Sequence, residues 1–446
     1  MQRVTSMTEG NPAKLILSFA FPLILTNVGQ QLYMIVDASV VGRGIGVKAL
    51  AAVGSADWSY WLILWTITGL TQGFATFIAR YFGEQDYKRM NMAIAMSALL
   101  CAVIGGILTA AGLLAARPLL VLLQTPEDII GGATVYLLTM ISGTLIVMAY
   151  NMAAAVLRAF GNGRSPLHAM LIAAFLNVGL DLLFVMVFHW GIFGAAIASV
   201  SAQLVSFLYC LTQIKKIAYV QIPKNTWIPD RKMLKELLAF GLPIAFQYIV
   251  IAISGIVLQS TINTQGSSFI AGYTATNKLY GLLESTAISL GLAFSTFFSQ
   301  NYGAGKKARM KKGVQTGVKI VVAAAACVTA AVLLAGKYML QMFIDAGENE
   351  GTAALQIAWH YLLVMAVSLI ICYLIHVYRN AMQAMGNSFW SMISGFAECG
   401  IRVVMAKAVV SWIGTEVLFY IEPAAWLGAL LAIMIPYYYY QRKLLS

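Results

Sequence analysis

Long apolar stretches, separated by short polar ones, follow one another along almost the whole chain. Each is roughly 20 residues or longer, enough for an α-helix to cross about 30 Å of hydrocarbon. They are continuously apolar, without the alternation typical of a membrane β-barrel. The pattern predicts an all-α membrane protein with twelve transmembrane helices. The expected spans are residues 13–40, 49–79, 91–115, 133–158, 166–189, 191–214, 235–263, 268–300, 313–336, 354–385, 388–413 and 418–440.

Composition and charge agree with this pattern. A chain with 60% hydrophobic and 10% charged residues has too little polar surface to cover a soluble globule. The net charge of +12 would suit nucleic-acid binding. With twelve spans and both termini inside, however, twenty Lys and Arg fall in inner segments and four in outer ones. This bias follows the positive-inside rule and predicts a multi-pass protein of the plasma or bacterial inner membrane, which we expect to be a monomer. We therefore expect cytoplasmic termini, contacts with membrane lipids and no nucleic-acid partner.

The chain also repeats itself. FATFIARYFGEQDYKRM at 74–90 and FSTFFSQNYGAGKKARM at 294–310 share six identities in seventeen positions at an offset of 220, where chance would give roughly one or two. LRAFGN at 157–162 matches MQAMGN at 382–387, and Pro22 of the first span matches Pro243 of the seventh.

The repeat predicts two lobes of six helices each. The expected divisions are an N-terminal lobe of residues 1–214, a cytoplasmic linker of residues 215–234 and a C-terminal lobe of residues 235–446. An even number of helices returns the chain to its starting side, so the lobes are related by a pseudo-two-fold axis along the membrane normal. Two such bundles are typical of a transporter that works by alternating access.

Acidic residues at membrane depth mark a candidate site in the first half, because ionisable groups there are costly and usually functional. Asp37 has Tyr33 four residues before it, and Asp181 has Asn177 four residues before it, so each pair shares a helix face. Ser199 in the sixth span supplies a further hydroxyl. This set suits a proton-binding pair, or an Na⁺ site at Asp37, Asn177, Asp181 and Ser199. The alternative is that both acids only satisfy packing hydrogen bonds between helices.

A proline lies inside the first predicted span. Pro22 removes a backbone hydrogen bond and predicts a kink there. A moving hinge and a static kink are both open, because proline is common in membrane helices.

The second half has polar residues in different places. Gln247, Lys278, Glu284, Glu398 and Arg402 are candidates to line a cavity, contact substrate or couple helices. Glu398 and Arg402 are four residues apart, a spacing that favours an internal ion pair.

Other chemistry lacks its residue patterns. The four histidines have no neighbouring nucleophile and base, so a membrane-embedded enzyme is disfavoured. No GxxxxGK[ST] motif is present, which argues against ATP-driven pumping. We expect a protein that is not an enzyme and that uses no cofactor apart from H⁺ or Na⁺ as coupling ion.

Several fragments resemble the multidrug and toxic compound extrusion (MATE) transporters, and their order and spacing extend the likeness over nearly the whole chain. They are FPLILTNVGQQLYMIVDASVVGRGIGVKALAAVG at 21–54, LRAFGNGRSP at 157–166, LNVGLDLLF at 176–184 with GAAIAS at 194–199, and SQNYGAGK at 299–306.

This resemblance implies export of cationic, amphipathic drugs in exchange for H⁺ or Na⁺. By the same resemblance, Asp37 is the first-helix carboxylate, Pro22 is the proline near which that helix bends, and Tyr33, Asn177, Asp181 and Ser199 complete the N-lobe cation site, with Ser199 where the family often has Thr. The seventh and tenth spans lack the acids of the NorM-like branch, so the chain is more similar to the DinF-like branch. The alternative within transporters is a lipid-linked oligosaccharide flippase, which needs a strongly basic central cavity for diphosphate.

Overall fold

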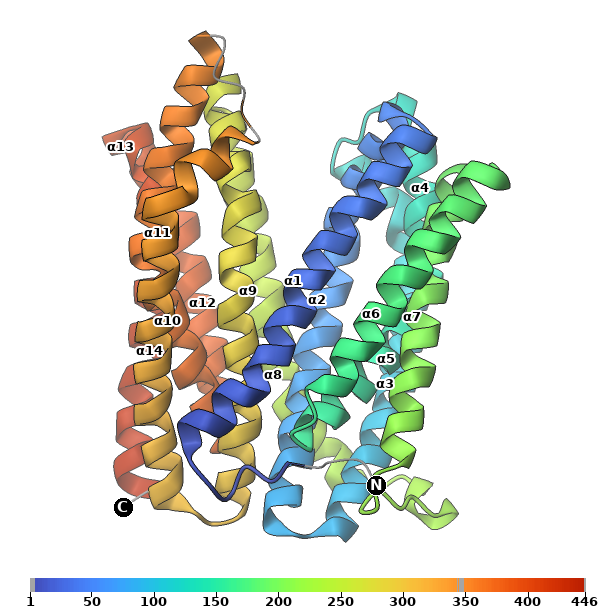
Figure 1. Ribbon diagram of the computed structural model, residues 1–446, viewed down its shortest axis with the longest axis vertical. Helices are drawn as coiled ribbons and strands as arrows, with labels where there is room; N and C mark the ends of the chain where they lie inside the picture. The colour runs from blue at the N-terminus through green and yellow to red at the C-terminus, as the bar shows by residue number, and fades with distance from the viewer. Residues whose placement is uncertain (1–4, 343, 345–348, 445–446) are drawn as a thin grey trace. The chain divides into compact units, whose positions relative to one another are not determined.

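The computed structural model describes residues 5–342, 344 and 349–444, without the side chains of Val47, Trp58, Asn349, Glu350 and Leu444. The described residues form helices joined by short turns, with no strand (Figure 1). Ten of these helices are long and apolar enough to cross a membrane. The all-α membrane class predicted by the apolar stretches is therefore confirmed.

One of the twelve predicted spans is bent at a break, and the eleventh contains an internal π-helix. The fourth consists of α4 (Glu127–Ser142) and α5 (Thr144–Ala159), which are bent by 48° at Gly143 and would form an eleventh crossing. The eleventh consists of α12 (Ser388–Val404), the π-helix η3 (Met405–Val409) and the short α13 (Val410–Ile413). Continuous apolar sequence did not reveal either feature.

The chain divides into two compact units. The first unit consists of Met1–Ser6 and Phe21–Ala245, and the second of Met7–Ala20 and Phe246–Ser446. Helices α1 (Pro12–Gly44) and α8 (Arg231–Ile262) each change unit within two residues of their prolines, Pro22 and Pro243. The predicted lobes, residues 1–214 and 235–446, are continuous stretches of chain, whereas each of these units combines two separate stretches. The lobe limits therefore stay a prediction.

The remaining helices belong wholly to one unit. In the first unit they are α2 (Val47–Glu84), α3 (Tyr87–Leu122), α4, α5, α6 (Arg164–Asp181), η1 (Leu182–Val187) and α7 (Gly191–Lys215), followed by the 3₁₀ turn η2 (Lys224–Trp227). In the second unit they are α9 (Ser267–Gly303), α10 (Lys307–Gln341), α11 (Asn349–Ala384), α12, η3, α13, η4 (Thr415–Tyr420) and α14 (Ile421–Leu444).

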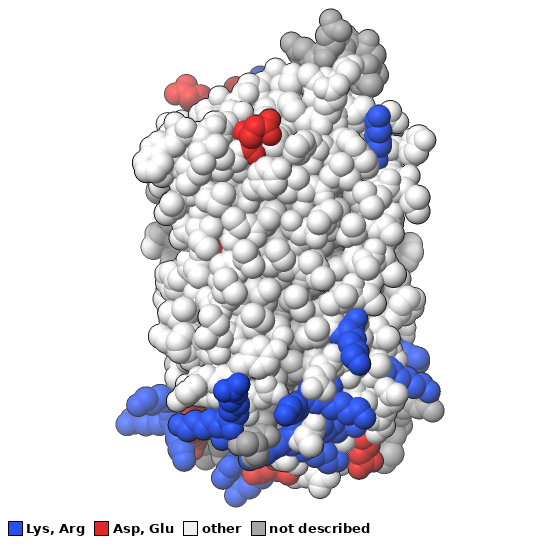
Figure 2. All heavy atoms as spheres, turned by 90° about the vertical axis from the view of Figure 1, so that its left-hand side faces the viewer, with Lys and Arg blue, Asp and Glu red and all other residues white. Residues whose placement is uncertain are grey.

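Large apolar side chains cover the outside of these helices. Leu114, Phe175, Leu334 and Trp412 are each more than three-quarters exposed, which in water would be a large aggregation-prone surface. Figure 2, which faces the second unit, shows Lys and Arg gathered at the lower end below a wide band with few charged side chains. An apolar band beside a basic end is expected of a multi-pass membrane protein.

The first part of α8 packs against α2 through small residues in the first unit. A Cβ on Gly69 would lie 2.7 Å from Ala245 Cα, and one on Gly73 would lie 2.7 Å from Gly241 Cα. Two small residues spaced by four on each helix let membrane helices approach closely without a hydrophobic driving force.

The later part of α8 packs against α12 in the second unit. A Cβ on Gly395 would lie 2.7 Å from Gln247 Cγ. The two parts of α8 therefore have different partners, which explains why the unit boundary falls within this helix near Pro243.

Both units contain a π-helix at a corresponding place. Helix α6 continues into η1, and α12 continues into η3. Such single-turn π segments are rare and often occur at functional sites. Asp181 at the end of α6 and Arg402 near the end of α12 belong to the polar centres described below.

Candidate functional site

Asp37 of α1 and Asp181 of α6 meet in the first unit. Their carboxyl groups lie within hydrogen-bonding reach of each other. Asp181 is fully buried and Asp37 half-buried. The Oδ1 atom of each acid receives no N–H or O–H donor from the described residues. Because two carboxylates repel each other without a donor, this pair needs a shared proton or a bound cation.

Asn177 links the acid pair to α7. Its Nδ2 donates to Asp181 Oδ2 at 2.7 Å, and its oxygen accepts from the Ser199 hydroxyl at 3.2 Å. The opposite orientation of the amide would place the Asn177 oxygen against Asp181 Oδ2. Helical spacing put Asn177 one turn before Asp181, and the fold adds Ser199 from α7.

Tyr33 completes the centre from α1. Its phenol lies 3.3 Å from Ser199 Oγ, and both acids are its electrostatic neighbours. The phenol thus hydrogen-bonds Ser199 instead of Asp37, the partner suggested by the spacing within α1. The five residues predicted for the first half lie together in one unit. We call them the first-unit centre.

Three further residues adjoin this centre and were missed in the sequence. Tyr136 of α4 has Asp57, Asp37, Tyr33 and Tyr60 as electrostatic neighbours. Asp57 is an acid inside the predicted span 49–79, so the criterion that singled out Asp37 applied to it as well. The tyrosines carried no signal, because aromatic residues are frequent throughout these helices.

The oxygen atoms of the first-unit centre suit a proton or a small cation. Carboxylate oxygens without donors are ligands for Na⁺ or sites for H⁺. With the Asn177 amide directed as described, its NH₂ and not its oxygen faces Asp181, so an Na⁺ ligand role for Asn177 requires the amide to turn. Among the described residues, no three His, Cys, Asp or Glu side chains gather as a metal site.

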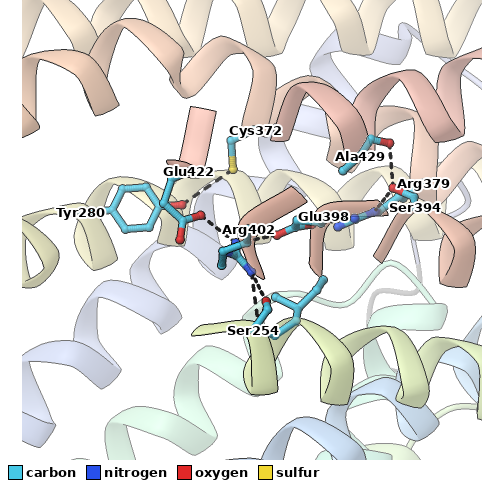
Figure 3. Close-up of polar contacts among 10 residues, drawn as sticks. Ser254, Tyr280, Cys372, Arg379, Ser394, Glu398, Arg402, Glu422 and Ala429 are labelled. Atoms are coloured by element: carbon cyan, nitrogen blue, oxygen red, sulfur yellow. Dashed lines mark hydrogen bonds and ion pairs between the residues drawn. The ribbon is translucent and has the colours of Figure 1, made fainter. Parts of the chain in front are cut away.

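A ladder of alternating charges lies in the second unit (Figure 3). Arg379 Nη2 lies 2.8 Å from Glu398 Oε2, Glu398 Oε1 lies 3.0 Å from Arg402 Nη2, and this nitrogen lies 2.7 Å from Glu422 Oε2. These four residues come from α11, α12 and α14, and their side chains are between 5% and 15% exposed. We call them the second-unit ladder. The ion pair expected between Glu398 and Arg402 is present within it.

Arg379 and Glu422 were not identified in the sequence, although each is a charged residue in a predicted span. Their partners come from other helices, so the intrahelical spacing that pointed to Glu398 and Arg402 did not apply to them. Burying all four is tolerable because each guanidinium faces a carboxylate.

The other second-half candidates lie around this ladder or apart from it. Glu284 of α9 hydrogen-bonds the Tyr280 side chain and has Glu422 as an electrostatic neighbour. Gln247 is buried against Gly395, and its Oε1 has no partner among the described residues. Lys278 is exposed. The second-half candidates therefore do not form one cluster.

The internal repeat also appears in the comparison with known families. The sequence profile of the MatE family matches this chain twice, at residues 22–183 and 243–407. The chain belongs to the MatE family. Both matches begin at the proline of a unit-changing helix, Pro22 in α1 and Pro243 in α8, so the MatE profile pairs the same markers as the repeat.

Curated relatives of this MatE chain are bacterial proteins. It is 29% identical to the "Probable multidrug resistance protein YpnP" of Bacillus subtilis (strain 168) over 340 residues, which are 76% of either chain. It is 26% identical to the "Probable multidrug resistance protein YoeA" of the same strain over 434 residues, covering 95% of this chain and 92% of the relative.

Solved structures share the fold. One is described as the "Outward-facing conformation of a multidrug resistance MATE family transporter of the MOP superfamily", with a TM-score of 0.91 and 22% identity over 100% of this chain and 99% of that one. At this identity the likeness shows the fold alone. The predicted fold of twelve transmembrane helices in two lobes is confirmed for this MatE chain.

Proposed function

We propose that this protein exports cationic, amphipathic compounds by exchange with H⁺ or Na⁺, and that the first-unit centre couples the two movements. The observation that carries the proposal is the contact between Asp37 and Asp181, two carboxyl groups from different helices whose Oδ1 atoms have no donor among the described residues. Binding and release of a cation there changes which helices attract one another, which is the physical requirement for coupling.

Membership of the MatE family and the names of the relatives support this proposal. Two relatives that match three-quarters or more of the chain are named as probable multidrug resistance proteins. The homologues are named as transporters, in keeping with the expectation that the chain is not an enzyme. Lipids around a monomer and cytoplasmic termini remain part of the proposal, as does likeness to the DinF-like branch.

The flippase alternative is not favoured by the charges of the second unit. A lipid-linked diphosphate needs unpaired basic groups. Arg379 and Arg402 are buried, but Glu398 and Glu422 neutralise them.

Removal of the Asp37 charge tests the coupling. We expect Asp37→Asn to lower gradient-driven ethidium efflux from proteoliposomes by about tenfold or more, since coupling free energies of roughly 1–3 kcal/mol correspond to such factors. Asp128→Asn is the matched control, because Asp128 is an exposed acid that pairs with Lys48 at 3.3 Å. Efflux by Asp37→Asn at the parental rate would refute coupling at this centre.

The choice of ion needs the two gradients imposed separately on the same proteoliposomes. If the protein exchanges H⁺, a pH gradient without Na⁺ drives efflux of the wild type. If it exchanges Na⁺, only the Na⁺ gradient does. Efflux that ignores both gradients would exclude cation exchange altogether.

A further inference from the structure

The second unit contains a polar centre at the positions that correspond, through the repeat, to the first-unit centre. The prolines give the first correspondence. Tyr33 lies as far after Pro22 along α1 as Ser254 lies after Pro243 along α8, so Tyr33 and Ser254 occupy corresponding positions. The two matches of the family profile also start at these prolines, in keeping with this correspondence.

The turns before α6 and α12 give the second correspondence. Gly161 and Gly386 are left-handed, with φ of 71° and 88°, and the asparagine after each donates its N–H to a carbonyl five residues back, at 3.0 Å in both turns. Asn177 lies as far after Gly161 as Arg402 lies after Gly386, so Asn177 and Arg402 occupy corresponding positions.

The glycines before α7 and α14 give the third correspondence. Gly191 and Gly414 follow the two π-helices and have φ of 58° and 108°. Ser199 lies as far after Gly191 as Glu422 lies after Gly414, so Ser199 and Glu422 occupy corresponding positions.

The corresponding residues also meet in each unit, and the contact between Asn177 and Ser199 corresponds to the one between Arg402 and Glu422. In the first unit, Ser199 hydrogen-bonds Tyr33 and Asn177. In the second unit, Arg402 donates to Ser254 Oγ and to Glu422. Three positions from three helices therefore meet in each unit, although all three residue types differ.

The two acids of the first unit have no acidic counterpart. Counted from the prolines, Asp37 corresponds to Leu258, and counted from the left-handed glycines, Asp181 corresponds to Ala406. Leu258 and Ala406 are buried and apolar. The second unit therefore lacks an acid at both positions that form the pair in the first.

The carboxylates of the second unit come from other positions. Glu398 precedes Arg402 by one helical turn, and Glu422 lies on α14. Both contact the guanidinium of Arg402, so a cationic side chain occupies the place between these two acids.

We infer that the second unit holds a carboxylate-lined cation site that is permanently filled by its own Arg402, where the first unit has an exchangeable site. The ligands of this built-in cation are Glu398, Glu422 and the Ser254 hydroxyl. Arg379 neutralises the second oxygen of Glu398, so the four charges of the ladder sum to zero. If Arg402 is removed, the site should accept a small planar organic cation of the guanidinium class, which matches carboxylates in the same way.

The inference concerns the second unit alone and does not rest on the coupling ion proposed for the first. It means that this second-unit site does not exchange its cation, because a guanidinium attached to α12 cannot leave. It also gives Arg402 a second role, since the same side chain ties α12 to α8 and α14.

Chemical rescue of Arg402→Ala tests this inference on the purified full-length protein. Loss of Arg402 leaves the buried Glu422 carboxylate unpaired and Glu398 with Arg379 alone, so we expect the melting temperature of this variant to fall by about 5 °C or more. Millimolar methylguanidinium should restore at least half of this loss in a saturable manner. Wild type should not respond, and adding Asp37→Asn should leave the rescue unchanged, which separates this result from any failure of the coupling proposal.

The control is the neutral variant Arg402→Ala with Glu422→Gln, in which Arg379 and Glu398 still pair and no carboxylate is left without a cation, so it should not respond to methylguanidinium. An equal response in this variant, or no response in Arg402→Ala, would overturn the inference. If Arg402→Ala is recovered only when methylguanidinium is present during purification, the inference is supported. If it cannot be recovered even then, while the neutral variant can, the inference is wrong.

Discussion

At the scale of single residues, Ser199 holds the first-unit centre together. Its hydroxyl contacts Tyr33 of α1 at 3.3 Å and Asn177 of α6 at 3.2 Å, so one small side chain on α7 connects three helices. The acids depend on it indirectly, since Asn177 donates to Asp181.

We expect Ser199→Ala to weaken the apparent affinity for the coupling ion about tenfold, because an unsatisfied buried polar group costs roughly 1–3 kcal/mol. The measurement is the cation concentration that gives half-maximal efflux. Ser199→Thr keeps the hydroxyl and is the matched control. Equal apparent affinities in the Ala and Thr variants would show that the hydroxyl does not order this centre.

At the scale of helices, close backbone contact fixes α2 against the first part of α8. Gly69 faces the Ala245 Cα, an atom that cannot rotate away as a side chain would. Helix α2 also contains Gly54, and a Cβ added to this glycine would have no neighbouring atom within 4 Å.

Gly69→Ala is expected to destabilise the protein by about 1–3 kcal/mol, the usual cost of overpacking. Gly54→Ala should be neutral or stabilising by up to about 1 kcal/mol, because alanine is the better helix former. Thermal unfolding in detergent compares the two. A Gly69→Ala variant as stable as Gly54→Ala would mean that α2 and α8 do not approach as closely as described.

At the scale of the whole molecule, the distribution of Lys and Arg determines the orientation we propose in the membrane. The segment between α7 and α8 should be cytoplasmic, and the start of α4 should lie outside. Asn225 and Glu127 are exposed residues in these two places.

Labelling of single cysteines tests this orientation. In a background without Cys327 and Cys399, the cysteines that are not buried, a membrane-impermeant maleimide should label Glu127→Cys in intact cells. Asn225→Cys should react only after the membrane is opened. Labelling of Asn225→Cys in intact cells would place the segment between α7 and α8 outside and contradict the orientation.

Several features were accessible from the sequence because they depend on local chain properties. Apolar length predicted the helices, since a membrane helix satisfies its own backbone hydrogen bonds. Asp37 and Asp181 stood out because an acid in an apolar run is conspicuous wherever it points. Their one-turn neighbours Tyr33 and Asn177 followed from helical spacing.

Other features depend on which helices pack together, and the sequence does not state this. Asp37 and Asp181 are far apart along the chain, and only the fold brings them into contact. The Arg379 and Glu422 partners of the ladder lie on α11 and α14, so no spacing within α12 pointed to them. Likewise, the division of α8 follows from its contacts with α2 and α12.

The sequence by itself determined that this chain crosses a membrane many times, that its halves are related, and that buried acids occupy the first half. Tertiary structure decided that those acids form a pair and that the four charges of the second-unit ladder neutralise one another. The physical reason is that the burial of a charge is set by hydropathy along the chain, whereas its partner is set by side chains brought close from distant helices.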